Sequence, residues 1–172
     1  WNDLGNFTLT MNTPTFGKEP SEKSEVMIGY DEYYLWIGAR LFSKDPSKIV
    51  STSKKRDETS KSSDSFGIIL DTYNDNENAL SFFTLPSSAR IDYAIYNDAE
   101  IIGGAAAPES PPMMAINMTW NTFWDVKTTR DDKGWYVEMR IPFSSLRFQT
   151  VNDVVKMGLI INRTISYNNE ID

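Results

Sequence analysis

The stretch Gly134–Phe148 reads Gly-Trp-Tyr-Val-Glu-Met-Arg-Ile-Pro-Phe-Ser-Ser-Leu-Arg-Phe, and it decides the fold class. Apolar and charged residues alternate through its middle, which is the period of a strand with one buried face. The apolar positions are Val137, Met139 and Ile141, and the charged positions are Glu138 and Arg140. Pro142 ends the strand because its nitrogen has no hydrogen to donate to a neighbouring strand. The stretch therefore predicts a half-buried β-strand.

Other segments with strand character lie on both sides of this stretch, separated by polar turns. They are 24–31, 34–43, 64–73, 79–85, 89–96, 124–131, 135–141 and 154–167. Asp31 and Glu32 join the first two segments into a hairpin, and Asp132-Lys133-Gly134 is a second hairpin turn, in which glycine supplies a positive φ. Many strands with little helix predict a single domain over residues 1–172. We expect an antiparallel β-sandwich of jelly-roll or immunoglobulin-like type.

Three segments lack strand periodicity. Residues 44–63 are rich in Ser, Lys and Asp and predict a long loop, with a short strand or turn at Ile49–Ser53. Residues 99–122 are rich in Gly, Ala, Pro and Met, so we expect no regular element through most of them. Phe143–Phe148 predicts one helical turn with Ser144 as its N-cap.

The charge of the chain argues against nucleic acid as a partner. The formal net charge is -7 at pH 7. Phosphate backbones are bound by clustered Lys and Arg, and the one basic run, 54–56, is followed at once by Asp57 and Glu58. We therefore expect no binding to DNA or RNA.

The absence of histidine and cysteine restricts the catalytic chemistry. It excludes Ser-His-Asp and Cys-His arrangements, thiolate nucleophiles and most zinc sites. A glycosidase would need two carboxylates about 5–10 Å apart, and Asp64, Asp71 and Asp92 lie on nearby predicted strands. Among 24 acidic residues, however, such a pair is expected by chance. We expect that the chain is not an enzyme.

No basic segment followed by an apolar one opens the chain, and no apolar run is long enough to span a bilayer. The chain begins at Trp1 and ends shortly after Glu170. We expect it to be a segment of a longer protein, with a leader or a downstream membrane part outside the sequence given.

The predicted hairpin tip 71–78 is rich in oxygen ligands. Asp71, Asn74, Asp75 and Glu77 lie close together there, and Ca²⁺ prefers such ligands. The spacing and glycine of an EF-hand are absent, and Asn and Asp also dominate hairpin turns for backbone reasons alone. Both interpretations, a calcium site and an ordinary polar turn, follow from the same residues.

Aromatic side chains with polar neighbours can form a platform for sugars, because the C–H faces of pyranose rings stack on Trp and Tyr. The candidates are Tyr93, Tyr96, Trp120, Phe123 and Trp124. The alternative is that strand aromatics fill the core. Trp120 follows a flexible sequence and is the aromatic residue most readily expected to be exposed.

Arg90 and Asp92 share one face of the predicted strand 89–96, beside Tyr96. A guanidinium next to a carboxylate could clamp a polyol or a carboxylate ligand. The alternative is a surface ion pair, which contributes little to stability.

The stretch Gly134–Phe148 also resembles the signature GW..E..IPf.sLrf of family 9 carbohydrate-binding modules. It is similar in particular to the version at the N-terminus of a large family of Gram-negative outer-membrane barrel proteins. The likeness covers nearly the whole chain. It extends through Pro20–Val26, Tyr30-Asp31, Leu35–Arg40, Asp64–Gly67 and Leu70–Asp75.

The resemblance implies a non-catalytic module that binds a glycan or oligosaccharide. It also implies an exported protein, periplasmic or associated with the outer membrane, whose polypeptide continues into an outer-membrane β-barrel. In the family, an Arg followed two residues later by an amide or acid belongs to the sugar site. The resemblance thus assigns Arg90 and Asp92 to ligand binding.

The chain departs from the family pattern at three places. Gly67 stands where the family has a Glu, the segment Thr59–Ser63 replaces a Trp, and a Trp after the last strand is absent. These departures favour a second hypothesis, a structural or interaction domain that docks on its own barrel or on a partner protein. A concave cleft with an aromatic wall would favour sugar binding, and a flat apolar patch would favour docking.

Overall fold

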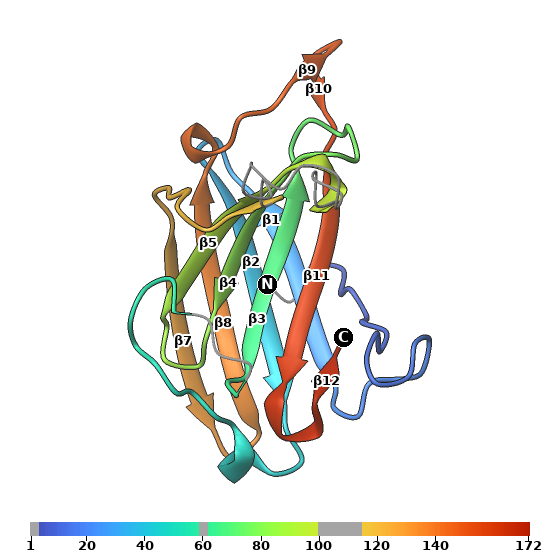
Figure 1. The fold of residues 1–172 in the computed structure, drawn as a ribbon, viewed down its shortest axis with the longest axis vertical. Helices are drawn as coiled ribbons and strands as arrows, with labels where there is room; N and C mark the ends of the chain where they lie inside the picture. Colours follow the sequence, from blue (N-terminus) through green and yellow to red (C-terminus); the bar gives the residue numbers. More distant parts are fainter. Residues whose placement is uncertain (1–3, 59–61, 100–114) are drawn as a thin grey trace, which may run out of the picture.

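Two antiparallel β-sheets form a sandwich in the computed structural model, which describes residues 4–58, 62–99 and 115–172 (Figure 1). The four-stranded sheet has the order β1 (Ser24–Tyr30), β2 (Tyr34–Phe42), β8 (Gly134–Pro142) and β7 (Asp125–Asp131). The six-stranded sheet has the order β12 (Glu170–Ile171), β11 (Gly158–Ile165), β3 (Ser65–Asp71), β4 (Ala79–Thr84), β5 (Arg90–Ile95) and β6 (Ile116–Asn117). The predicted all-β sandwich is confirmed.

Helical structure in the described residues consists of four short 3₁₀ turns. They are η1 (Pro46–Lys48), η2 (Asn97–Ala99), η3 (Phe143–Ser145) and η4 (Ser166–Asn168). No helix in this part of the chain is long and apolar enough to cross a membrane.

The predicted strand in Gly134–Phe148 is β8, the inner neighbour of both β2 and β7. Ile37 lies opposite Met139, and Ala39 lies opposite Val137, so the apolar faces read from the sequence coincide. These side chains are buried. Burial of each large aliphatic side chain stabilises the folded state by roughly 1.5–3 kcal/mol. This register therefore puts the stabilising apolar side chains on one face, and the core lies between the two sheets.

The core continues through the inward side chains of the six-stranded sheet. The buried members from that sheet are Phe66, Ile68, Leu70 and Phe82. They pack against two tryptophans of the other sheet region, Trp124 and Trp135, which are also buried.

Gly134 fulfils the role that the sequence predicts for it. Its φ is 151°, and a Cβ built there would lie 2.2 Å from the carbonyl oxygen of Leu41. The turn Asp132-Lys133 therefore needs glycine at its end, both for the backbone conformation and for the close approach of β2.

Three local predictions are wrong. No strand forms at Ile49–Ser53; instead Asp45 caps the 3₁₀ turn η1 through a hydrogen bond from the Ser47 amide. Ser144 lies inside η3, whose N-cap is Pro142 without a side-chain hydrogen bond. The segment predicted as one strand at 154–167 is divided into β10 (Val154–Val155), β11 and η4.

The N-terminal segment is tied to both sheets by isolated bridges. Phe7 pairs with Val26 of β1, and Thr13 pairs with Ile171 of β12. Of the segment 99–122, which was predicted to lack regular structure, residues 100–114 lie outside the described part, and Ile116–Asn117 form the short strand β6.

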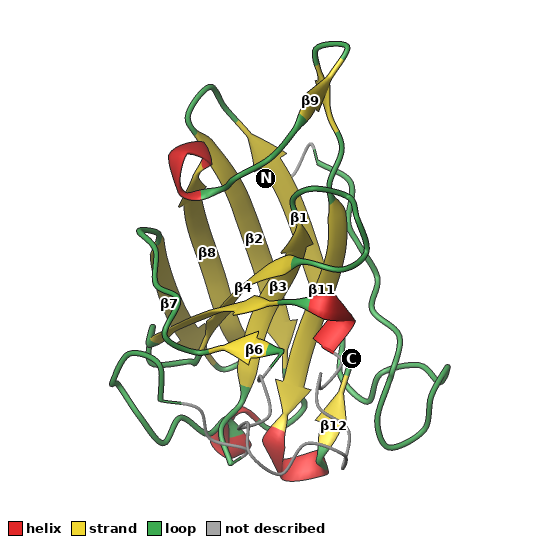
Figure 2. Cartoon of the chain, turned by 45° about the horizontal axis from the view of Figure 1, so that its top comes forward, coloured by secondary structure: helices red, strands yellow, loops and turns green. Residues whose placement is uncertain are grey.

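The small hairpin of β9 (Thr150–Val151) and β10 belongs to neither sheet. It projects beyond one end of the sandwich (Figures 1 and 2). Its three valines are exposed, with exposed fractions of 66% for Val151, 52% for Val154 and 40% for Val155.

Candidate ligand-binding groove

Arg90 and Asp92 share one face of β5, as predicted, but this face points into the sandwich. Asp92 is fully buried, and Arg90 Nη1 donates to the carbonyl oxygen of Trp124 at 2.5 Å. A surface clamp formed by both side chains is therefore wrong, because Asp92 is buried. Ligand contact by the half-buried Arg90 stays a prediction. Strand alternation defines two faces but does not say which one faces the other sheet.

Asp92 instead organises a network beneath the chain segment 120–124. Its Oδ1 accepts hydrogen bonds from Arg56 Nη2 at 2.6 Å and from Trp124 Nε1 at 3.2 Å. Its Oδ2 accepts from the Thr122 amide at 2.9 Å. Arg56 Nη2 also donates to Asn121 Oδ1 and, at 3.1 Å, to the Thr122 carbonyl oxygen. The ion pair of Arg56 and Asp92 thus holds this segment in place.

Trp124 is fully buried and packs edge-on against Phe82, with ring centroids 5.5 Å apart. The prediction that Trp124 contacts a ligand is wrong, because its ring faces the core and its indole nitrogen is engaged by Asp92. It immediately precedes β7.

Tyr96 and Trp120 lie at a concave surface, as the sugar hypothesis requires. Both line a hollow of about 480 Å³, which we call the end groove. Tyr96 has an exposed fraction of 40%, and Trp120 is half-buried, with its ring edge-on to Phe82 at 6.0 Å. The two aromatic residues therefore contribute side chains to a groove of ligand size.

The end groove is built where several strands end together. Its lining comes from four parts of the chain, which contribute Thr72, Tyr73 and Asn78–Leu80, then Ala94–Tyr96, then Trp120–Thr122, and then Ser144, Ser145 and Arg147. These are the turn between β3 and β4, the end of β5, the approach to β7 and the exit from β8. The antiparallel pairing brings all four to the same end of the sandwich.

The polar lining of the end groove offers both donors and acceptors. Amide and hydroxyl groups come from Asn78, Asn121, Thr122 and Ser144. The side-chain oxygen of Asn121 already accepts a hydrogen bond from Arg56. Arg147 is the one charged side chain among the described lining residues, and it is exposed. Such a lining suits a ligand rich in hydroxyl groups.

The acidic hairpin tip is held by its own hydrogen bonds. Asp71 accepts from the amides of Asp75 and Asn76 at 3.2 and 2.8 Å. Asp75 Oδ1 accepts from the amides of Glu77 and Asn78, both at 2.8 Å. The hydrogen bond from the Asn78 side chain, followed by the backbone ones, lowers the pKa of Asp75. These bonds account for the polar composition of the turn.

Asn74 has a φ of 53° and Asn76 a φ of 59°, the left-handed conformation that Asn tolerates well. The described part of the chain places no group of three or more acidic side chains where they could hold a metal ion. A calcium site formed by Asp71, Asn74, Asp75 and Glu77 stays a prediction.

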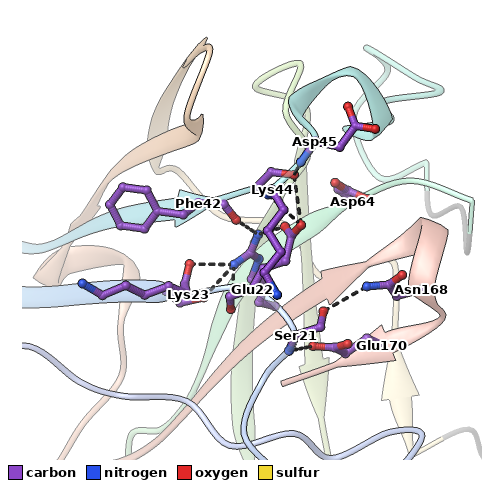
Figure 3. A network of polar contacts seen from close by, with 12 residues as sticks. Ser21, Glu22, Lys23, Phe42, Lys44, Asp45, Asp64, Asn168 and Glu170 are labelled. Carbon is purple, nitrogen blue, oxygen red and sulfur yellow. Dashed lines mark hydrogen bonds and ion pairs between the residues drawn. The ribbon is translucent and has the colours of Figure 1, made fainter.

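A second polar network ties the two sheets together near β12 (Figure 3). Glu22 and Arg163 are both buried, and Arg163 Nη2 lies 3.3 Å from Glu22 Oε2. Arg163 also donates to the carbonyl oxygens of Lys23 at 3.0 Å and Phe42 at 2.6 Å. Burial, together with the hydrogen bond that its hydroxyl donates to Glu22 at 2.6 Å, raises the pKa of Tyr167 to about 12.

The same network contains carboxyl groups with raised pKa values. Burial raises the pKa of Asp64, although its Oδ1 accepts from Ser166. Burial and the neighbouring charge of Glu170 raise the pKa of Asp172 to about 7. The three carboxylates considered for a glycosidase all have hydrogen-bond partners within the fold. Asp64 accepts from Ser166, Asp92 accepts from Arg56, and Asp71 accepts from the amide of Asn76 in the hairpin turn.

Sequence reasoning missed three residues that shape the end groove. Arg56 and Asn121 lie in segments read only as loops, where periodicity gives no orientation. Arg147 lies in the quoted stretch, but one helical turn does not reveal which side chains face a groove. Phe123, a further aromatic candidate, is 64% exposed and lies outside the lining.

No protein-family model matches the chain, and no curated protein matches its sequence. Solved structures that resemble its fold include the following two. One is a family 9 carbohydrate-binding module from Caldicellulosiruptor kristjanssonii in complex with glucose, with a TM-score of 0.59 and 16% sequence identity over 95% of this chain and 68% of that chain. The other is such a module from the same organism in complex with cellotriose, with a TM-score of 0.54 and 17% identity over 95% of this chain and 67% of that chain. The chain therefore has the fold of a family 9 carbohydrate-binding module.

Proposed function

We propose that this chain is a non-catalytic carbohydrate-binding module whose ligand lies in the end groove. The observation that carries the proposal is the joint lining by Tyr96 and Trp120 of a concave, polar-rimmed hollow. Sugar rings present C–H faces for stacking on aromatic rings and hydroxyl groups for the amides and hydroxyls around them. A hollow of about 480 Å³ has the size of a small-ligand site.

The comparison structures support a hexose-based ligand. They were solved with glucose and with cellotriose, and they share the fold of this chain. The chain differs from the family pattern in its aromatic residues, because the segment Thr59–Ser63 replaces one Trp and a Trp after the last strand is absent. Trp124 is buried and cannot take their place. Trp120 and Tyr96 would take the stacking role.

The non-catalytic assignment rests on the state of the carboxylates. A glycosidase needs one free acid and one free base or nucleophile beside the scissile bond. No carboxylate belongs to the described lining of the end groove. We therefore propose binding without turnover.

A structural or interaction domain is the second candidate, and the β9–β10 hairpin favours it. Val151, Val154 and Val155 form an exposed apolar tip on a projecting element. Such a tip could dock against an outer-membrane β-barrel of the same polypeptide. The stretch Gly134–Phe148 supports this setting, an exported protein in the periplasm or at the outer membrane, through its resemblance to such proteins.

Calorimetric titration with glucose and cellotriose tests the proposed function. We expect binding by the wild type and a loss of affinity of roughly tenfold or more for Trp120→Ala and Tyr96→Ala, since each removes a stacking surface. Phe123→Ala is the matched control, because it removes an exposed aromatic ring outside the end groove. Equal affinities for all four proteins would exclude the end groove as the binding site.

A further inference from the structure

Arg147 differs from every other arginine of the chain. The sequence contains seven arginines, and six of them donate hydrogen bonds to other residues of the chain: Arg40, Arg56, Arg90, Arg130, Arg140 and Arg163. For example, Arg140 binds Asp125 at 2.5 Å. Arg147 has no hydrogen bond or ion pair with any residue in the described part of the chain. It is exposed, and it lines the end groove.

The protein has a net charge of -7. Acidic side chains are abundant, yet none of them lies among the described lining of the end groove. The guanidinium is permanently charged and presents donors in a planar fork, which matches a carboxylate or sulfate and has no comparable preference for a neutral hydroxyl. The chemistry at this rim of the groove therefore favours an anionic group.

The acidic hairpin limits where such a group could lie. Asp71, Glu77 and Asp98 line a neighbouring hollow, which shares Asn78, Ala79 and Ile95 with the end groove. Negative charge on a ligand is disfavoured on that side, because like charges repel. Arg147 comes from another segment, the exit from β8, so the charge near the hairpin is negative and the charge contributed by this segment is positive. This asymmetry would fix the direction of a charged sugar in the groove.

We propose that the end groove selects a sugar with an anionic substituent, the carboxylate of a uronic acid or a sulfate ester, and that Arg147 determines this selectivity. The inference rests on the proposed function, because it names the class of ligand for the same groove. Trp120 and Tyr96 hold the sugar ring, and Arg147 binds its charged group. Both kinds of substituent present oxygens that accept from the guanidinium fork.

The test compares three sugars that differ only at carbon 6: glucose, glucuronic acid and glucose 6-sulfate. They are titrated into the wild type at low ionic strength, because salt screens an exposed charge pair. We expect at least one anionic sugar to bind roughly tenfold or more tightly than glucose. This is the gain in affinity expected from one hydrogen bond between charged groups. The sugar that gains most identifies whether carboxylate or sulfate is preferred.

Variants assign the selectivity to Arg147. Arg147→Gln should bind all three sugars with the affinity that the wild type has for glucose. Arg147→Lys keeps the charge but not the fork, and should retain part of the preference. Arg130→Gln is the matched control, because Arg130 is an exposed arginine on β7 outside the end groove. It should leave the preference unchanged. Melting curves check that each variant is folded.

Two results would overturn the proposal in distinguishable ways. If the wild type binds glucose as tightly as both anionic sugars, the selectivity is refuted while sugar binding stands. If none of the three sugars nor cellotriose binds, the proposed function fails and the selectivity fails with it. A preference for anionic sugars that survives in Arg147→Gln would also refute the role of Arg147.

Discussion

Arg56 Nη2 lies 2.6 Å from Asp92 Oδ1, and this ion pair joins the long loop before β3 to the buried centre of β5. The carboxylate is fully buried, whereas the guanidinium keeps some exposure. Asp92 also accepts from the Thr122 amide, so the pair fixes the chain that carries Trp120 to the end groove. Asp92, which the sequence predicts to contact a ligand, therefore positions other residues of the chain.

Removal of the buried carboxylate should strongly destabilise the fold. Asp92→Ala breaks the ion pair with Arg56 and leaves the Trp124 indole and the Thr122 amide without their acceptor, and we expect a loss of about 3–5 kcal/mol in the free energy of unfolding. Chemical denaturation measures this loss. Asp125→Ala is the control: it breaks the half-exposed pair with Arg140, and should cost about 1 kcal/mol or less. Similar losses for both variants would contradict the assignment.

Gly134 should not tolerate a side chain. A Cβ would meet the Leu41 carbonyl oxygen, and the φ of 151° is strained for any other residue. We expect Gly134→Ala to destabilise the fold by more than about 1 kcal/mol. Gly5→Ala is the control, because nothing lies within 4 Å of a Cβ at that position. Thermal melting of both variants decides, and equal midpoints would refute the close approach of β2.

Stability should depend on pH through Asp172. Its pKa is raised to about 7 by burial and by Glu170, with Arg163, Glu22 and Asp64 nearby. The folded state therefore holds the proton more tightly than the unfolded state. The resulting stability is fully present at low pH and is lost as pH rises from about 4 to about 7.

Asp172→Asn should remove this dependence, because the amide does not titrate. We expect the unfolding free energy of the wild type, relative to this variant, to fall by about 1 kcal/mol or more between pH 5 and pH 7.5. Denaturant titrations at several pH values measure the difference. Parallel pH profiles for the two proteins would show that the carboxyl group is not perturbed.

Calcium binding by the hairpin 71–78 is tested by thermal melting. If the ion binds the folded hairpin, millimolar CaCl₂ should raise the melting temperature relative to EDTA by mass action. Asp75→Asn should abolish that rise. Asp131→Asn serves as control, because Asp131 is also an exposed acceptor of backbone hydrogen bonds, in another turn. A melting curve unchanged by calcium would remove the predicted site.

The sequence predicts the sandwich well because its strands have one apolar face. In β2 and β8 the alternation is regular, and Ile37 and Met139 meet as expected. The alternation does not identify the inward face of β5, because both faces of that strand carry apolar residues. Ile91 and Ala94 are both buried, on opposite sides of the strand. Periodicity alone could not show that Asp92 points inward, because the decisive partner, Arg56, comes from a distant loop.

The candidate site was predicted only in part for the same reason. Tyr96 and Trp120 reach the end groove, and Trp124 and Asp92 do not. The groove is assembled from four segments that are far apart in the sequence, and local patterns contain no information on how such ends converge. No sequence pattern identifies Arg147 as a residue of the groove; its place there follows from the structure.

The tryptophan indole signals in a ¹⁵N–¹H nuclear magnetic resonance titration with cellotriose test the central claim most directly. The chain has five tryptophans, and Trp120 is the one that lines the end groove among those described. We predict that the Trp120 indole signal shifts in a saturable manner, while the signals of buried Trp135 and of Trp36 on β2, which do not line the groove, stay in place. Saturable shifts at Trp36 with none at Trp120, or no shift at any indole, would contradict a glycan site in the end groove.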